Sequence, residues 1–161
     1  MSSHQPVVVI GVGNDFRQDD GVGLVVARRV QSAAGHVRVV VGIPDGTRMI
    51  DVWDGADLAV VVDCTSAAGQ PGRVHCFEAL HEAIPEGVFR SFSTHCFSIR
   101  STFDLARTLD RLPQRLVVYG IEGERFDMGE GLSPQVGLAA EQVTSRIIDE
   151  IDAGDSLKET E

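Results

Sequence analysis

Two carboxylates and one imidazole fall at positions where a parallel sheet would bring them together. Asp20 lies in a turn after an apolar run at residues 7–12, and Asp63 ends a second apolar run at 57–63. His95 stands in a loop shortly before a predicted helix. Because the carboxyl ends of parallel strands meet at one edge of a sheet, these side chains can converge there. Such a trio can bind a divalent transition metal and leave coordination positions open.

Each of these residues also has an ordinary structural interpretation. The turn at 11–23 holds adjacent carboxylates among four glycines, and an aspartate there can cap the following helix. We expect that capping role for Asp19. Asp63 could form a turn at the strand end, and a lone histidine before a helix is more often a cap or a surface residue. Residue types and spacing alone therefore leave the trio as a hypothesis.

The elements that must position these residues alternate between strand and helix. Apolar runs typical of buried strands occur at 7–12, 36–43, 57–63 and 115–121. A shorter alternating segment at 73–77 predicts an edge strand. This alternation predicts an α/β fold of three αβα layers. Its mostly parallel, twisted sheet would have about five strands, with one short antiparallel edge strand.

Helical spacing of apolar residues begins near Val22, Thr47, Ile99 and Ser133. We expect Thr47 to cap the second of these helices and the third to run over 99–112, because Pro113 follows it. Ser133-Pro134 is a typical start for the last helix. We therefore expect a single α/β domain at 1–152, followed by a polar C-terminal tail at 153–161.

Composition and charge exclude some classes of partner. The chain has 161 residues, and its 14 basic and 24 acidic residues give a net charge of -10, which disfavours a nucleic-acid surface. No apolar run reaches the roughly 18 residues of a membrane span, and the first residues lack a basic signal-like region. Three cysteines without a C-x-x-C pair fit a reducing compartment. We expect a cytoplasmic monomer without a membrane partner.

The motifs, taken in chain order, resemble those of the [NiFe]-hydrogenase maturation endopeptidases. The stretch at 11–23 is similar to the family's opening motif, and Asp63 to its second acidic ligand. Asp45-Gly46-Thr47 is similar to the family's turn after the second strand, and Ser93-Thr94-His95 resembles its S-x-H element. Gly120-Ile121-Glu122, followed by the segment 131–136, is similar to the family's last strand and the start of its final helix. The ordered set spans nearly the whole chain.

The resemblance implies an endopeptidase that removes the C-terminal extension from the nickel-loaded precursor of a [NiFe]-hydrogenase large subunit. It places the metal-contacting and catalytic positions on Asp20, Asp63 and His95. The precursor would bring the nickel, so no tightly bound intrinsic metal is expected. Nickel would polarise the scissile carbonyl or act only as a template, and one carboxylate could serve as the base. Thr94 stands where many members have proline.

Other functions stay open on the sequence. A non-catalytic, nickel-sensing clamp for the hydrogenase precursor would use the same trio. A nucleotide-binding module is disfavoured because Phe16 replaces the third glycine of G-x-G-x-x-G and the carboxylates would repel pyrophosphate.

A thiol hydrolase using Cys64 or Cys96 with His95 is also disfavoured, because neighbours such as His95 and Cys96 usually point in different directions. We expect all three cysteines to be buried apolar packing. Glu122 and Glu124, which follow the last predicted strand, are weaker candidates for substrate contact.

Overall fold

The computed structural model describes residues 7–42, 45–66, 68–85, 88–89 and 99–159, with side chains described as far as residue 154. Within these residues, five strands form one sheet in the order β2-β1-β3-β5-β4. The strands are β1 (Val7–Gly11), β2 (Arg38–Val41), β3 (Leu58–Thr65), β4 (Val74–Glu78) and β5 (Leu116–Glu122). The edge strand β4 runs antiparallel to β5, and the other neighbouring pairs are parallel.

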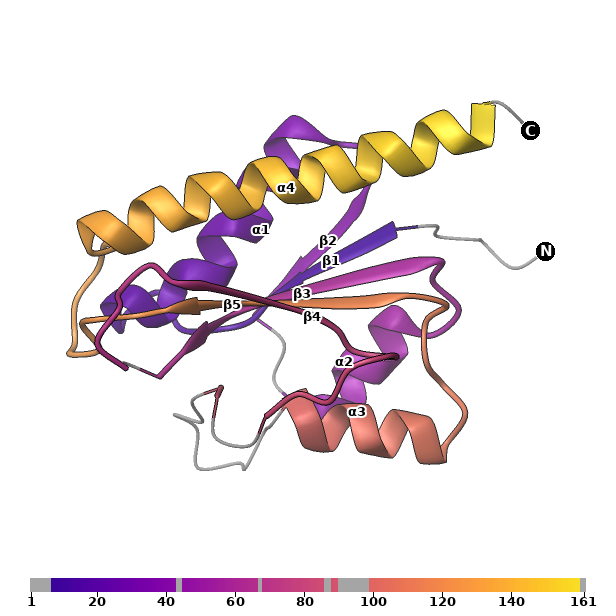
Figure 1. Cartoon of the computed structure of the whole chain (residues 1–161), viewed down its shortest axis with the longest axis horizontal. Coiled ribbons are helices and arrows are strands. Elements are labelled where there is room, and N and C mark those ends of the chain that lie inside the picture. Colours follow the sequence, from indigo (N-terminus) through magenta and orange to yellow (C-terminus); the bar gives the residue numbers. More distant parts are fainter. Residues whose placement is uncertain (1–6, 43–44, 67, 86–87, 90–98, 160–161) are drawn as a thin grey trace.

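Helices cover both faces of this sheet (Figure 1). They are α1 (Val22–Ala33), α2 (Gly46–Trp53), α3 (Ile99–Thr108) and α4 (Pro134–Glu159). In Figure 1, α1 and α4 lie on one face, and α2 and α3 lie on the other. The predicted three-layer αβα fold, with a mostly parallel sheet and a short antiparallel edge strand, is confirmed.

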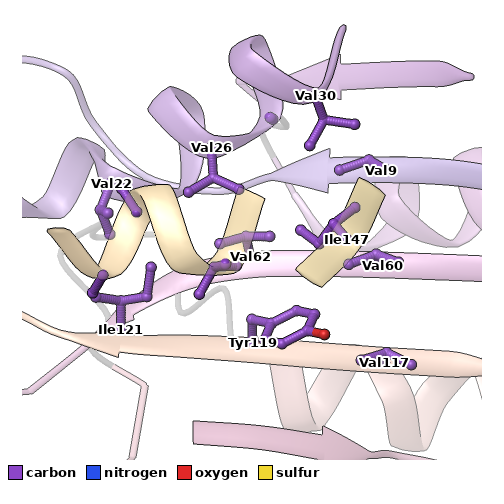
Figure 2. Close-up of a cluster of buried hydrophobic side chains, with 14 of the residues drawn as sticks. Val9, Val22, Val26, Val30, Val60, Val62, Val117, Tyr119, Ile121 and Ile147 are labelled. Carbon is purple, nitrogen blue, oxygen red and sulfur yellow. The ribbon is translucent and has the colours of Figure 1, made fainter. Parts of the chain in front are cut away.

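The strands that carry the site are anchored in a continuous apolar core. Val9, Val60 and Val117 are register partners across β1, β3 and β5, so they lie on one face of the sheet. Figure 2 shows them facing Val26 of α1 and Ile147 of α4, and all five side chains are buried. Each such buried side chain contributes about 1.5–3 kcal/mol. The strand ends are therefore held on a well-packed base.

The start of α2 differs from the prediction. Asp45, not Thr47, caps the helix, because the Asp45 carboxylate accepts a hydrogen bond of 2.9 Å from the backbone N–H of Arg48. The extended backbone of Asp45, with φ −160° and ψ 170°, gives its side chain the reach that an N-cap needs. Asp45 in the resembling turn therefore has a structural role at the start of α2.

The ends of α3 and α4 also differ from the prediction. Helix α3 stops at Thr108, not at residue 112, because Asp110 adopts a left-handed φ of 55° and the N–H of Arg111 bonds back to the Ala106 carbonyl at 2.9 Å. Helix α4 continues through most of the segment expected to be a polar tail, as far as Glu159. No proline interrupts that segment. None of the described helices combines the length and apolar character needed to cross a bilayer.

Candidate active site

Asp20 is held against the end of β1 by its own backbone. It belongs to a short 3-10 turn, Gln18–Gly21, and is only 5% exposed. A Cβ at Gly13 would lie 2.0 Å from the carbonyl oxygen of Asp20, and Gly13 has a φ of 143°. The N–H of Asn14 donates to the same carbonyl at 3.3 Å. Only glycine at position 13 allows this close approach, so the loop fixes where Asp20 emerges.

Asp63 lies within β3, two residues before that strand ends, and is also 5% exposed. The strand therefore extends beyond the predicted end at residue 63. The Asp63 carboxylate accepts one hydrogen bond, of 2.7 Å, from the N–H of Cys64. Burial raises the pKa of Asp63 well above its usual value, the Cys64 bond opposes the shift, and the negative charge of Asp20 raises the pKa further.

The structure therefore brings Asp20 and Asp63 close enough for their charges to interact at the carboxyl edge of the sheet. Such a pair can take up a proton, and a metal cation beside it would displace that proton by favouring the charged form. His95, the third predicted member, lies outside the described residues, as does Cys96. Among the residues that are described, no three His, Cys, Asp or Glu side chains are grouped to hold a metal ion.

Asp19 does not cap the helix that follows it, so that prediction is wrong. Its fully buried carboxylate reaches the last loop, which we define as residues 123–133, and accepts four hydrogen bonds there. The donors are the N–H groups of Glu124 and Arg125, each at 2.8 Å, and the N–H and hydroxyl of Ser133, each at 2.7 Å.

These four bonds decide the charge state of Asp19. Burial by itself would raise the pKa of Asp19, but the bonds from the backbone of Arg125, Ser133 and Glu124, and from the Ser133 hydroxyl, lower it below its usual value. Asp19 is therefore an ionised structural link beside Asp20.

Backbone hydrogen bonds join the same two loops. We call residues 12–21 the first loop. The N–H of Gln18 donates to the Gly129 carbonyl at 3.0 Å, the N–H of Gly129 donates to the Phe16 carbonyl at 2.9 Å, and the N–H of Asp19 donates to the Arg125 carbonyl at 3.0 Å. The backbone under Asp20 is thus fixed by residues more than 100 positions away in sequence.

Comparison with known proteins identifies the family of this chain. A family model described as hydrogenase maturation protease, HycI, matches residues 25–150. The chain belongs to this family. The curated hydrogenase expression/formation protein HupD of Thiocapsa roseopersicina is 26% identical over 141 residues, which are 84% of this chain and 63% of that relative. The chain therefore spans less than two thirds of the length of HupD.

Solved structures show the same fold. The hydrogenase maturating endopeptidase HybD from E. coli has a TM-score of 0.74 at 18% identity, with 92% of this chain and 93% of that chain covered. The [NiFe] hydrogenase maturation protease HycI from Thermococcus kodakarensis KOD1 has a TM-score of 0.66 at 23% identity, with the same coverage. At these identities the likeness concerns the fold.

Glu122 of this maturation protease is not available to a substrate. It is 1% exposed, and its carboxylate accepts a hydrogen bond from the N–H of Gln70. The Glu122 backbone also bonds to Gly72 and Arg73. The side chain therefore holds the loop after β3 against the end of β5, which makes the prediction of substrate contact wrong for Glu122. Glu124 is exposed.

The described cysteines separate into two environments. Cys64 is fully buried, with its sulfur 3.5 Å from the Thr65 carbonyl oxygen, as expected for apolar packing. Cys76 is exposed on the edge strand β4, so the expectation of burial is wrong there. An edge strand has a neighbour on one side only, which leaves more of its side chains open to solvent. The burial of Cys64 argues against its use as a nucleophile.

Proposed function

We propose that this maturation protease is an endopeptidase that removes the C-terminal extension from the nickel-loaded precursor of a [NiFe]-hydrogenase large subunit. The observation that carries the proposal is the buried Asp20–Asp63 pair at the carboxyl edge of the sheet, in a chain that belongs to the hydrogenase maturation proteases. The hydrogenase large-subunit precursor is the partner, and its nickel is cargo of the substrate.

In this proposal Asp20, Asp63 and His95 recognise the nickel that the precursor carries. The raised pKa of Asp63 favours the protonated form of its carboxyl when no cation is present. An arriving cation favours the ionised form, so nickel binding and proton loss are coupled. Without nickel, the trio meets no cation and the precursor binds more weakly. The site thereby distinguishes a loaded precursor from an unloaded one.

Cleavage then needs water beside the scissile peptide. One carboxylate takes a proton from the attacking water, whose oxygen bonds to the carbonyl carbon. The proton passes to the amide nitrogen as the carbon–nitrogen bond breaks, which releases the C-terminal peptide. We place this reaction in the cytoplasm, because cysteines without a pairing motif fit a reducing compartment.

A processing assay tests the proposal. The chain is incubated with nickel-loaded or nickel-free precursor, and the released C-terminal peptide is followed by mass spectrometry. We expect release only from the loaded precursor, none with Asp63→Asn, and ordinary release with Asp149→Asn, a control at an exposed position of α4. Nickel-dependent binding without release would instead identify a clamp. Release from both precursors would show that Asp20, Asp63 and His95 do not distinguish the nickel-loaded precursor from the nickel-free one.

A further inference from the structure

Two large apolar side chains are displayed on the joined loops beside Asp20. Phe16 of the first loop is 62% exposed, and Met128 of the last loop is 75% exposed. A single exposed apolar residue is ordinary, but neighbouring ones at the edge of a site point to an interaction surface. The sequence distance between Phe16 and Met128 hides their proximity.

Backbone pairing brings together the two chain segments that carry these side chains. Gly129 bonds to the carbonyl of Phe16 and to the N–H of Gln18, which is the pattern of a parallel bridge centred on Arg17 and Gly129. Phe16 and Met128 each lie one residue before that isolated bridge, so the bridge holds the backbone of these two residues side by side.

The first loop presents Phe16 in a fixed position. The N–H of Phe16 donates to the Asn14 side chain at 2.9 Å, and Asp15 forms a two-point ion pair with Arg28 of α1, at 2.7 and 3.0 Å. Gln18 holds a left-handed φ of 51°. A surface that is already ordered loses less conformational entropy when a partner binds.

Charge around the pair favours one kind of partner. The last loop exposes three acidic side chains, Glu124, Asp127 and Glu130, and one basic side chain, Arg125. The whole chain has a net charge of -10. A partner segment with apolar side chains between lysines or arginines would complement both the apolar pair and its acidic surroundings.

We propose that Phe16 and Met128 form a docking surface for the protein substrate. Their partner is a segment of the nickel-loaded precursor that carries apolar side chains flanked by basic ones. This inference rests on the proposed function, since it assigns the precursor to the same site. Phe16 lies four residues before Asp20 in the sequence. A segment bound at the docking surface therefore brings the rest of the precursor to the carboxylate pair.

Steady-state kinetics with a matched control test this surface. The double variant Phe16→Ser/Met128→Ser is compared with Leu105→Ser/Leu109→Ser, which removes two exposed leucines from the α3 region. We expect the first pair to raise the KM for the loaded precursor about tenfold or more, since buried aromatic anchors dominate interfaces. Its kcat and thermal midpoint should stay unchanged, and the control should change neither constant. An unchanged KM, or a loss confined to kcat, would overturn the proposal.

Binding measurements separate this proposal from the proposed function. Dissociation constants for the loaded precursor are measured with the unsubstituted chain and with the Phe16→Ser/Met128→Ser variant. If the unsubstituted chain binds but does not cleave, the proposed function fails, and a tenfold weaker affinity of the variant still supports docking. Equal affinities, or no binding by either chain, would overturn it. The proposal would also be overturned if the double variant lost a dimer that the unsubstituted chain forms and kept its affinity for the loaded precursor. That result would assign the surface to a second copy of the chain.

A charge reversal tests the chemistry of the partner segment. Asp127→Lys/Glu130→Lys should raise KM, and added salt should reduce the difference from the unsubstituted chain. Glu141→Lys/Asp149→Lys changes the net charge equally at exposed positions of α4, and should have a much smaller effect. Equal effects of the two reversals would overturn the basic character assigned to the partner.

Discussion

Asp19 and Asp63 are two buried aspartates of the same site region, but their surroundings differ. Asp19 accepts four hydrogen bonds, and its pKa is lowered. Among the described residues, Asp63 accepts one hydrogen bond, from the N–H of Cys64, and its pKa is raised well above the usual value by burial and by the charge of Asp20. Both side chains are nearly inaccessible to solvent, yet their pKa values shift in opposite directions.

The difference separates a structural carboxylate from one available for chemistry. A carboxylate whose lone pairs are all engaged stabilises the fold through its charge and has little capacity for a new ligand. A buried carboxylate with few donors gains from a proton or a cation. The number of hydrogen-bond donors, together with the depth of burial, therefore distinguishes Asp19 from Asp63.

The largest expected effect is on activity. Asp63→Asn should lower peptide release from the loaded precursor by about 10³-fold or more, because the proposed nickel contact and candidate base are both lost. Asp19→Asn should lower it by about 10- to 100-fold, through a small displacement of Asp20. Initial rates at saturating precursor measure both. If Asp19→Asn proved the more damaging to activity, the division of roles would be reversed.

The next largest effect is on stability, where Asp19→Asn should be more damaging than Asp63→Asn. Asp19→Asn should lower the free energy of unfolding by about 3–5 kcal/mol, because an amide can accept bonds at only one of the two positions and leaves buried donors unpaired. Urea denaturation at pH 7 measures the loss. Asp63→Asn is the matched comparison, and its amide oxygen can keep the bond from Cys64. A similar loss in both variants would contradict the comparison.

A smaller loss is expected from the other side of the Asp19 network. Ser133→Ala removes one hydroxyl donor and keeps the backbone N–H bond to Asp19, so it should cost about 1.5–3 kcal/mol. The combination Asp19→Asn/Ser133→Ala should cost less than the sum of the single changes, because they remove a shared bond. Full additivity in urea denaturation would show that the hydroxyl acts independently of Asp19.

The smallest effect is the pH dependence that Asp63 adds. A raised pKa means that the folded chain binds the Asp63 proton more tightly than the unfolded chain does. The resulting stability is full below the usual aspartate pKa and is lost as pH rises through the raised value. The Asp63→Asn variant should therefore be more stable than the unsubstituted chain at pH 8, by less than the stability that Ser133→Ala loses. This difference in the free energy of unfolding should shrink toward pH 4. Urea denaturation at several pH values measures it, and a difference that grew toward pH 4 would contradict the raised pKa of Asp63.

The sequence predicts the mostly parallel sheet, its antiparallel edge strand β4 and the approach of Asp20 to Asp63, because the apolar runs show where parallel strands end. It does not predict the role of Asp19, since its partners at 124–133 are set by tertiary packing and share no local pattern with it. The predicted cap of α2, Thr47, is wrong because threonine and aspartate can both cap a helix, and residue type alone does not choose between Thr47 and Asp45. The burial of Glu122 depends on the loop near Gln70, which no periodicity reveals.

The bonds from Asp19 to the last loop also determine when the site can form during synthesis. A ribosome makes Asp19 more than 100 residues before it makes Glu124, Arg125 and Ser133. Contacts of such long sequence separation form late in folding. A nascent chain that lacks Ser133 therefore contains Asp20 without the network that fixes it. The backbone around Asp20 therefore becomes fixed only after Ser133 has been synthesised and the last loop has folded back onto the first loop.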